Sequence, residues 1–589
     1  MTSQPTSQTP QPVARPRSGR KHPEILSQLS FFESDPPEVS SAPRSLEETQ
    51  LAPMFEETPL ETFPQEQGEV SELPQSEQEV CQVSAPLPDL AVFPEPGMLA
   101  WPFAFPPEPL TRAIERCVAR LSGSSIGGSR DAGFWQLVYL LCAKQVEERH
   151  AEWPKRFYTD QKEAKKEQGA QAIQERILPL FEQVKTAYPG LFSEDETLQL
   201  SASTLAPLVL ALCDQDLFGS ELDPFGATYQ QWAGARAREW RAQFFTPLGV
   251  AYFVISLLQP QAQERVLDAS CGAGVFFRAL QTYRRYYLSG IAALLEEAGH
   301  AIPAEELQQE LTAYMRSRVY GADLDGTLIR LARLQLSLLD GDPEHVYHMD
   351  SLAFPQEAEA CVQEQIPLGS LDLIVGNPPY SLPVTDPAIL GRYDLARVWK
   401  RRGETGWIPT DQLQKKVPTE VLFMEQALNW LKPGGRMALV VPESLLSNPG
   451  TTYARYWLMK HAYLLASISL PGETFQAQSH TGVHTGVLVL RKMTAEELEE
   501  EEKASCNYSI FMAVAECVGY DSRGRTVYAR TPDGELLQRA GERQVDNDLP
   551  AILASFWRFQ TSGEVDPPPP ALEAPIEPSK DDSNPLEVS

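Results

Sequence analysis

The distribution of apolar residues divides the chain into regions of different periodicity. From about residue 106 to 240, apolar residues recur at intervals of three and four, as in GFWQLVYLLCAKQVEER (133–149) and STLAPLVLALCDQDL (203–217). This spacing places the apolar side chains along one face of a helix. The pattern therefore predicts an all-α region over residues 106–240.

After residue 262 the apolar residues form short, β-branched runs separated by helical segments. Strands that alternate with helices predict an α/β domain, with a mostly parallel sheet and helices on both of its faces. Such sheets bind ligands at the carboxyl ends of their strands. The predicted strands lie in RVLDAS (265–270), RVYGADLD (318–325), HVYHMDSL (345–352), LDLIVGNPP (371–379), RMALVVPES (436–444), LLASISLP (464–471) and TGVLVLRK (485–492).

The two ends of the chain are predicted to be disordered tails. Residues 1–105 are rich in Pro, Glu, Gln and Ser and hold 16 acidic against 5 basic side chains, while residues 560–589 hold 7 against 1. Chains of this composition cannot bury enough apolar surface to become ordered. The net charge of the whole chain is −30, so the region between the tails is acidic too. Since binding to nucleic acid needs clustered Lys and Arg, we expect a partner to supply part of any DNA affinity.

Cysteine and histidine usage gives no sign of a metal site. The eight cysteines include no CxxC pair, and no histidine cluster has the spacing of metal ligands, so reduced thiols are expected. No apolar run reaches the roughly 18 residues that span a bilayer, and the N-terminus has no apolar signal core. We expect a cytoplasmic protein that does not associate with membranes.

The first predicted strand ends at Asp268 and runs into a glycine-containing turn, SCGAG. Gly272 and Gly274 would let the backbone approach a ligand closely, and the following helix would offer free N–H groups to an anion. The third glycine of the dinucleotide fingerprint is absent, so binding of a pyrophosphate is poorly supported. The methionine carboxylate of S-adenosylmethionine fits the pattern.

The next two predicted strands also end in aspartates. Asp323 could accept hydrogen bonds from a ribose diol, and Asp350 could accept one from an adenine amino group. Taken alone, each aspartate is more readily explained as a helix cap or a turn residue. Three aspartates at the ends of three successive strands favour a binding site.

The fourth predicted strand ends in GNPPY (376–380), where two consecutive prolines end the ladder because neither has an N–H to donate. Taken alone, the tetrapeptide could be a simple turn. In the order DASCGAG, GADLD, MDSL and GNPPY, however, the motifs resemble those of the N6-adenine DNA methyltransferases, although Ala269 stands where that family usually has Pro. AQFFTPLGVAYFV (242–254) resembles the motif that precedes the core in these enzymes.

Further segments resemble the modification subunits of type I restriction-modification systems. They are LDPFGATYQQW (222–232), LKPGGRMALVVPESLL (431–446), LPGETFQAQSHTGVHTGVLVLRK (470–492), IFMAVAECVGYDSRGR (510–525) and DNDLPAIL (546–553). The resemblance implies a Rossmann-like methyltransferase domain over 241–495, preceded by the α-helical domain at 106–240 and followed by a small extension at 496–559. It also implies S-adenosylmethionine as cofactor, double-stranded DNA as substrate, and a DNA-specificity subunit and a restriction subunit as partners.

The resemblance assigns roles to particular residues. The expected cofactor-binding residues are Gln243, Phe244, Phe245, Thr246, Pro247, Asp268, Ser270, Cys271, Gly272, Gly274, Asp323, Leu324, Asp350 and Ser351. The expected catalytic residues are Asn377, Pro378, Pro379 and Tyr380.

The Asn-Pro-Pro-Tyr segment suits an attack by the exocyclic amine of adenine. If the Asn377 side-chain oxygen and the Pro378 carbonyl each accept an N–H, the lone pair of that amine is freed for reaction. Preorganised dipoles would stabilise the charge that develops on nitrogen. A base in a duplex must first be flipped out, and Tyr380 is expected to offer it a stacking surface.

A local excess of basic residues follows this segment, in GRYDLARVWKRRGETGWIPTDQLQKK (391–416). With two tryptophans interleaved, it is a candidate contact for the DNA backbone. A solvated surface loop explains it nearly as well. The candidate DNA-contacting residues are Arg397, Lys400, Arg401 and Arg402.

Two other functions are compatible with parts of the pattern. Methyltransferases that modify a protein glutamine amide also use GNPPY, but they lack the QFFTP motif and the helical region. A non-catalytic scaffold in a defence complex could keep the fold for docking, although the intact reacting residues argue against it. Labelling of adenine in DNA rather than of a protein would separate these alternatives.

Overall fold

The computed structural model describes residues 101–103, 107–122, 130–241, 245–297, 300–403, 406–479, 482–503, 508–539 and 541–562. All of these belong to one compact unit of the chain, and a second unit, Asp35–Phe93, lies outside them. Gln243, Phe244 and most of the two predicted tails also lie outside the described residues.

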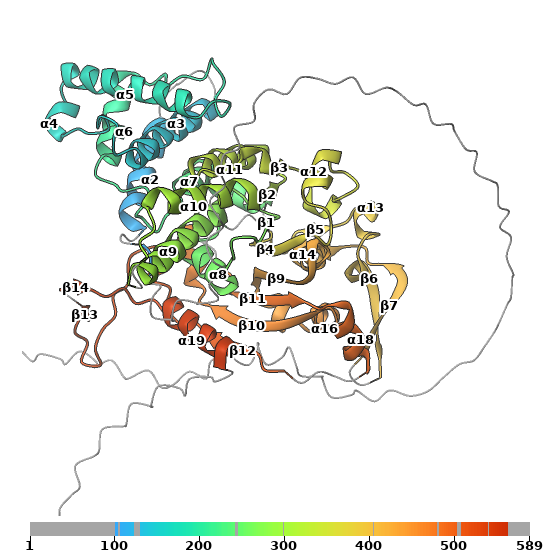
Figure 1. The fold of residues 1–589 in the computed structure, drawn as a ribbon. Coiled ribbons are helices and arrows are strands. Elements are labelled where there is room, and N and C mark those ends of the chain that lie inside the picture. Colours follow the sequence, from blue (N-terminus) through green and yellow to red (C-terminus); the bar gives the residue numbers. More distant parts are fainter. Residues whose placement is uncertain are drawn as a thin grey trace, which may run out of the picture. The chain divides into compact units, whose positions relative to one another are not determined.

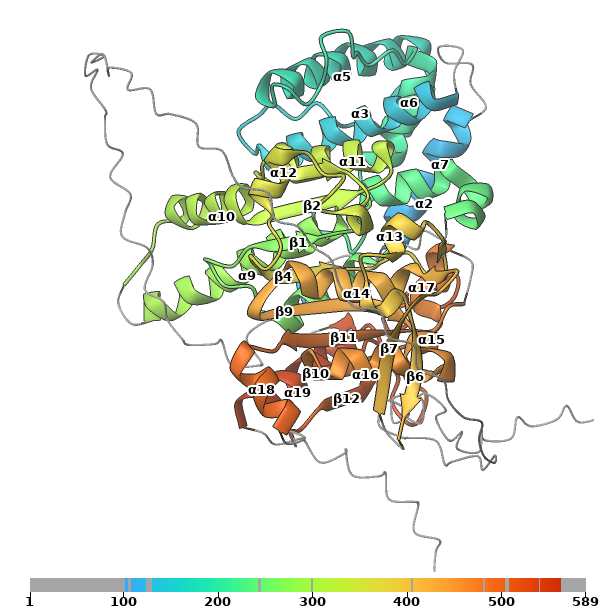
Figure 2. The ribbon, with the colours of Figure 1, turned by 90° about the vertical axis from the view of Figure 1, so that its right-hand side faces the viewer.

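An eight-stranded sheet forms the centre of the described region, with the strand order β12-β10-β11-β9-β4-β1-β2-β3 (Figures 1 and 2). Only β11 runs antiparallel to its neighbours. The strands are β1 (Val266–Asp268), β2 (Val319–Asp323), β3 (Val346–His348), β4 (Leu371–Gly376), β9 (Leu431–Pro442), β10 (Ala462–Leu470), β11 (Thr485–Lys492) and β12 (Phe511–Val514). Each of the seven predicted runs contains a strand, so the mostly parallel sheet is confirmed; β12 was not predicted.

The strand order changes direction at β1, which lies between β2 and β4. Asp268, the last residue of β1, pairs in register with Gly321 of β2 and with Val375 of β4. Chain segments that leave the carboxyl ends of β1 and β4 therefore diverge to opposite sides. A crevice at such a point is the usual ligand site of an open α/β sheet.

Helices cover both faces of the sheet (Figure 1): α8, α9 and α19 lie on one face, and α14 and α16 lie on the other. Every residue of α8 is buried, which explains its uniformly apolar sequence, LGVAYFVISLL. The helices of this region are α8 (Leu248–Leu258), α9 (Val275–Glu297), α10 (Ala304–Arg318), α11 (Gly326–Leu338), α12 (Ala360–Gln365), α13 (Pro387–Leu390), α14 (Thr419–Trp430), α15 (Glu443–Ser447), α16 (Thr452–Met459), α17 (Glu473–Ser479), α18 (Ala495–Lys503) and α19 (Leu549–Ser562).

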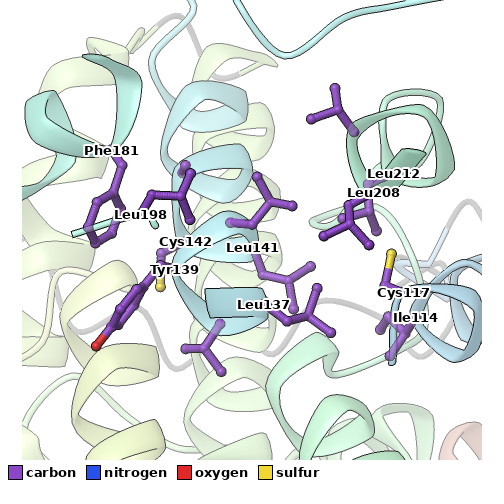
Figure 3. Packing of buried hydrophobic residues seen from close by; sticks show 14 of the residues in the cluster. Ile114, Cys117, Leu137, Tyr139, Leu141, Cys142, Phe181, Leu198, Leu208 and Leu212 are labelled. Carbon is purple, nitrogen blue, oxygen red and sulfur yellow. The ribbon is translucent and has the colours of Figure 1, made fainter. Parts of the chain in front are cut away.

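The predicted all-α region is confirmed. It consists of α2 (Glu108–Ser122), α3 (Arg130–Arg149), α4 (Gln161–Ala164), α5 (Glu167–Ala187), α6 (Ala202–Leu212) and α7 (Pro224–Arg241). Figure 3 shows buried side chains of its core, including Leu137, Tyr139 and Phe181. The same core continues into the apolar face of α11, through Leu328 and Leu331. The helical region thus shares one core with a helix of the α/β domain.

Short strand pairs and 3-10 turns complete the structure. The additional strands are β5 (Pro383–Val384), β6 (Arg397–Arg402), β7 (Gly406–Leu413), β8 (Val417–Pro418), β13 (Gln538–Arg539) and β14 (Glu542–Arg543), paired as β5–β8, β6–β7 and β13–β14. The 3-10 turns are η1 (Pro343–His345), η2 (Ser351–Ala353), η3 (Asp394–Ala396) and η4 (Pro449–Thr451).

The last helix fastens the C-terminal extension to the sheet. Phe556 and Phe559 of α19 lie against Phe511 of β12, and the Trp557 indole N–H donates to the Ser256 carbonyl at 3.1 Å. Among the described residues, no helix combines the length and the apolar composition that a membrane span requires.

Candidate active site

A cavity of about 830 Å³ opens at the carboxyl ends of β1, β2 and β4. Its walls come from the turn after β1, the start of α11, the turn after β3, the segment after β4 and the start of α14. The sequence-predicted residues that line it are Phe245, Thr246, Ser270, Cys271, Gly272, Asp323, Leu324, Asp350, Ser351, Asn377 and Pro379. Of the predicted cofactor-binding and catalytic residues with described positions, five do not line it: Pro247, Asp268, Gly274, Pro378 and Tyr380.

Asp268 is a buried carboxylic acid beside the cavity. Its Oδ1 accepts the backbone N–H of Ser270 at 3.1 Å, whereas Oδ2 is buried and has no hydrogen-bond partner among the described residues. Burial, reinforced by the nearby charge of Asp323, raises the pKa of Asp268 to about 8. An unsatisfied buried acceptor costs free energy, so this oxygen suits a cationic donor that reaches the end of β1.

Glycines shape the backbone around Asp268. Gly272 and Gly274 have φ angles of +53° and +92°, a region that other residues rarely adopt. A Cβ on Gly274 would lie 2.8 Å from the Phe277 ring. The turn thus needs glycine for its conformation at both positions and for space at Gly274.

Asp323 ties the end of β2 to this turn. Its Oδ2 accepts the Gly272 N–H at 3.0 Å, and its Oδ1 accepts the Asp325 N–H at 2.9 Å. A carboxylate oxygen can accept more than one hydrogen bond, so Asp323 can still serve a ligand hydroxyl. The neighbouring Leu324 is 68% exposed and presents an apolar side chain to the cavity.

Asp325 and Asp350 cap short structural elements at the rim. Asp325 caps α11 through the Thr327 N–H at 2.8 Å, and Asp350 caps η2 through the Leu352 N–H at 2.9 Å. Both aspartates also line the cavity. One oxygen of Asp350 therefore acts as a cap, which is the alternative that the sequence left open. This cap does not prevent Asp350 from contacting a ligand in the cavity.

The helical region contributes a side chain that sequence reasoning missed. The Tyr229 hydroxyl of α7 donates to Asp325 Oδ2 at 3.2 Å, and the Tyr229 ring lies 5.6 Å from that of Phe245. Tyr229 falls within LDPFGATYQQW, a segment singled out only by its resemblance. No periodicity marked its hydroxyl as part of a site.

Asn377 lies in the first turn after β4 and faces the cavity. Its Oδ1 accepts a hydrogen bond from the Tyr380 hydroxyl. Because the Tyr380 ring is only 3% exposed and does not line the cavity, the expected stacking surface is not present in this structure. Burial raises the pKa of Tyr380 well above its usual value, so the hydroxyl remains a hydrogen-bond donor.

The start of α14 fixes the Asn-Pro-Pro-Tyr turn from the opposite side. Thr419 Oγ1 donates to the Pro379 carbonyl at 2.8 Å, and the Thr419 N–H donates to the Leu382 carbonyl at 2.9 Å. Glu420 Oε2 accepts the Ser381 N–H at 2.8 Å. Ser381 has a φ of +58°, a strained conformation for a serine. Two consecutive side chains thus hold the turn in a conformation that it would not adopt alone.

The predicted basic segment forms the β6–β7 hairpin rather than an irregular loop. Arg397 lies 3.4 Å from Asp394, while Lys400, Arg401 and Arg402 are exposed. No group of His, Cys, Asp or Glu with metal-binding geometry occurs among the described residues.

Comparison with known proteins places this site within one family. The family model described as N-6 DNA Methylase matches residues 215–515. The methylase subunit of the type I restriction enzyme StySPI of Salmonella potsdam is 23% identical over 376 residues, which are 61% of this chain and 64% of that protein. The EcoKI methylase subunit of Escherichia coli K12 is 22% identical over 63% of this chain and 64% of its own length.

The chain therefore spans less than two thirds of the length of either relative. Among solved structures, it is similar to the methyltransferase subunit of a type I restriction-modification system from Streptococcus thermophilus. That similarity covers 68% of this chain and 93% of the other, at 18% identity and a TM-score of 0.38.

The buried carboxyl of Asp268 should make stability depend on pH. Its pKa of about 8 exceeds the ordinary value of 3.8, so between these values the folded chain binds more protons than the unfolded one. The contribution of Asp268 to the free energy of unfolding is thus most favourable at low pH. It decreases as pH rises toward 8, by about 1 kcal/mol per pH unit. Asp268→Asn should become more stable relative to the parent as pH rises.

Urea denaturation of both proteins from pH 5 to 8 measures this difference. Asp411→Asn, the same change at an exposed aspartate of β7, serves as the matched control. A constant difference for Asp268→Asn would show that Asp268 is ionised throughout.

Proposed function

The chain belongs to the N-6 DNA methylase family, and on that premise we propose that it transfers a methyl group from S-adenosylmethionine to N6 of adenine in DNA. The observation that carries this proposal is the position of Asn377. Its side chain faces the same cavity as Asp323 and the turn after Asp268. A nucleophile held by Asn377 would thus share one space with a ligand held at β1 and β2.

The residues around the cavity fit the proposed cofactor. Asp268 Oδ2, buried and unpartnered among the described residues, suits the ammonium group of the methionine moiety. Asp323 suits the ribose hydroxyls, and Asp350 the adenine amino group. Leu324 and Phe423 add apolar surface for a purine ring. When bound, S-adenosylmethionine supplies an electrophilic methyl group.

The turn after β4 would activate the amine of the target adenine. This amine is a poor nucleophile because its lone pair is delocalised into the ring. Asn377 Oδ1 has two lone pairs, and Tyr380 uses one of them. In the proposed reaction, Asn377 Oδ1 also accepts one N–H of the substrate amine, and the Pro378 carbonyl accepts the other. These acceptors draw the nitrogen toward a tetrahedral geometry and stabilise the positive charge that develops on it.

The atoms and charges of this reaction balance without a further reagent. Methyl transfer forms a bond from N6 to carbon and breaks the bond between that carbon and the donor's sulfur, which keeps the electron pair. N6 then releases one proton to solvent. The chain's own contribution is to place the amine and hold its two acceptors fixed, which is the entropic part of catalysis.

Asn377→Ala should abolish methyl transfer while leaving cofactor affinity within about twofold of the parent, because the lost acceptor acts mainly in the transition state. Transfer of radiolabelled methyl groups to DNA measures the first quantity, and calorimetry with S-adenosylmethionine measures the second. Asn448→Ala, at an exposed asparagine that caps η4, is the matched control. Parental activity in Asn377→Ala would contradict the mechanism.

Glu420 should act as a positioning residue through Ser381. In Glu420→Ala the Ser381 N–H loses its acceptor, and the strained φ of +58° loses its support. We expect kcat to fall at least tenfold with little change in cofactor affinity or thermal midpoint. Glu420→Gln retains an acceptor oxygen and should recover most of the activity. Equal kcat values in the parent and the alanine variant would rule out this role.

We infer further that the chain acts with a DNA-specificity subunit, and with a restriction subunit in the same system. The similar methylase subunits of type I restriction enzymes support this inference. So does the chain's net charge of −30, which is unfavourable for tight DNA binding by the chain alone. The predicted docking region for the specificity subunit is the α-helical region at 106–240.

Expression of the chain in a host without adenine methylation tests the need for a partner. Mapping of N6-methyladenine across the genome should find no efficiently methylated motif. Co-expression with a DNA-specificity subunit should produce methylation of one defined motif. Efficient methylation of one motif by the chain alone would show that it reads sequence without a partner.

A further inference from the structure

The β6–β7 hairpin is a two-stranded ribbon (Figure 2). The register of its strands gives it two chemically different faces. In its register, Lys400 pairs with Ile408 and Arg402 with Gly406, while Trp399 pairs with Pro409 and Arg401 with Trp407. Directly opposed residues project to the same side of an antiparallel pair, and neighbours along a strand alternate. Lys400, Arg402 and Ile408 thus share one face, and the two tryptophans share the other.

The tryptophan face is anchored to the α/β domain. The rings of Trp399 and Trp407 lie 6.0 Å and 6.5 Å from the ring of Tyr453 in α16. The Trp399 indole N–H donates to the Asp394 carbonyl at 3.0 Å. These aromatic contacts hold the ribbon in place on the α/β domain.

The opposite face is basic and exposed. Lys400 and Arg402 of β6 are exposed. Ile408 of β7, which lies opposite Lys400 on the same face, is 40% exposed. Among the described residues, neither Lys400 nor Arg402 forms an ion pair. The face is complementary to a polyanion.

The ribbon grows directly from the rim of the cavity. Val384 and Ile389, which precede it in the chain, and Thr419 and Phe423, which follow it, all line the cavity. Its base is rigid, because Glu425 of α14 accepts the backbone N–H groups of Asp394 and Leu395, both at 2.9 Å. Lys400 and Arg402 lie three and five residues beyond Arg397, the first residue of β6, or about 10 and 17 Å along the strand. A duplex bound to them would therefore extend from the outer part of the ribbon toward the cavity.

We propose that the outward face of the β6–β7 ribbon, through Lys400 and Arg402, binds the phosphate backbone of duplex DNA next to the adenine that enters the cavity. This inference rests on the proposed function and adds to it the surface that holds the substrate. It also divides the four predicted DNA contacts: Lys400 and Arg402 bind phosphate, whereas Arg401 lies on the anchored face and Arg397 is held by Asp394. Phosphate contacts of this kind position the duplex and do not read its sequence.

The test measures the salt dependence of DNA binding by the full chain. Fluorescence anisotropy with a labelled duplex, at 20 to 100 mM salt, gives the slope of log K against log salt. Each lost phosphate contact makes that slope less negative by about 0.9. The double variant with Lys400→Gln and Arg402→Gln should thus change it by about 1.8 and bind at least fivefold more weakly. Arg401→Gln, which removes the same charge from the anchored face, should leave the slope unchanged.

The outcomes separate this inference from the proposed function. The proposal is wrong if the double variant keeps the parental salt slope, because the ribbon face then does not bind phosphate. It is also wrong if Arg401→Gln changes the salt slope by half as much as the double variant does, or more. In either case, labelling of DNA by the parent and its loss in Asn377→Ala would leave the proposed function intact. A parent that does not bind S-adenosylmethionine, and that labels no DNA even with a DNA-specificity subunit present, would overturn the function itself.

Discussion

The pairing of β1 with β2 and β4 is the constraint on which the site depends. Asp268 is in register with Gly321 of β2 and with Val375 of β4. Asp323 lies two residues after Gly321, and Asn377 lies two residues after Val375, so both lie just beyond Asp268 at the same edge of the sheet. Space is tight on both sides: a Cβ on Gly321 would lie 2.4 Å from the Phe277 ring, and one on Gly376 would lie 3.1 Å from Asp268 Oδ1. A larger residue at Gly321 would displace the Phe277 ring of α9, and one at Gly376 would require the Asp268 side chain to shift. Either change would disturb the end of β1, next to the cavity.

The sequence predicted the strands and their polar ends because both signals are local. An apolar run that ends in Asp or in Asn-Pro-Pro indicates both a buried strand and the residue at which the strand stops. Parallel pairing of the strands then brings their carboxyl ends to one edge of the sheet. The supporting side chains were beyond such reasoning. Thr419 and Glu420 lie about forty residues after the turn that they hold and read as the ordinary start of a helix. Tyr380 was expected to offer a flipped base a stacking surface, yet Tyr380 is buried and its hydroxyl donates to Asn377 Oδ1.

The helical region and α11 share one hydrophobic core. The sequence pattern had predicted the helical region and the α/β domain as separate domains. Periodicity marked two regions with different patterns, and it could not show that the apolar face of α11 packs into the core of α2–α7. Ion pairs reinforce the junction: Arg149 of α3 lies 2.5 Å from Asp340, just beyond α11. Since Asp325, which lines the cavity, caps the start of α11, a displacement of the helical region that moves α11 also moves the rim of the cavity. Packing thus couples the helical region to the side of the cavity that Asp325 borders.

The other half of the site is held by polar groups that folding alone would not favour. Glu420 is almost fully buried, and burial raises its pKa, while Ser381 adopts a backbone conformation that disfavours serine. Each feature opposes stability, and strain of this kind persists where the surrounding structure over-determines it and function requires it. Here it lies one residue beyond the Asn-Pro-Pro-Tyr segment. A turn that merely ended β4 would need neither feature, so their presence argues that the positions of Asn377 Oδ1 and the Pro378 carbonyl are what the chain must maintain.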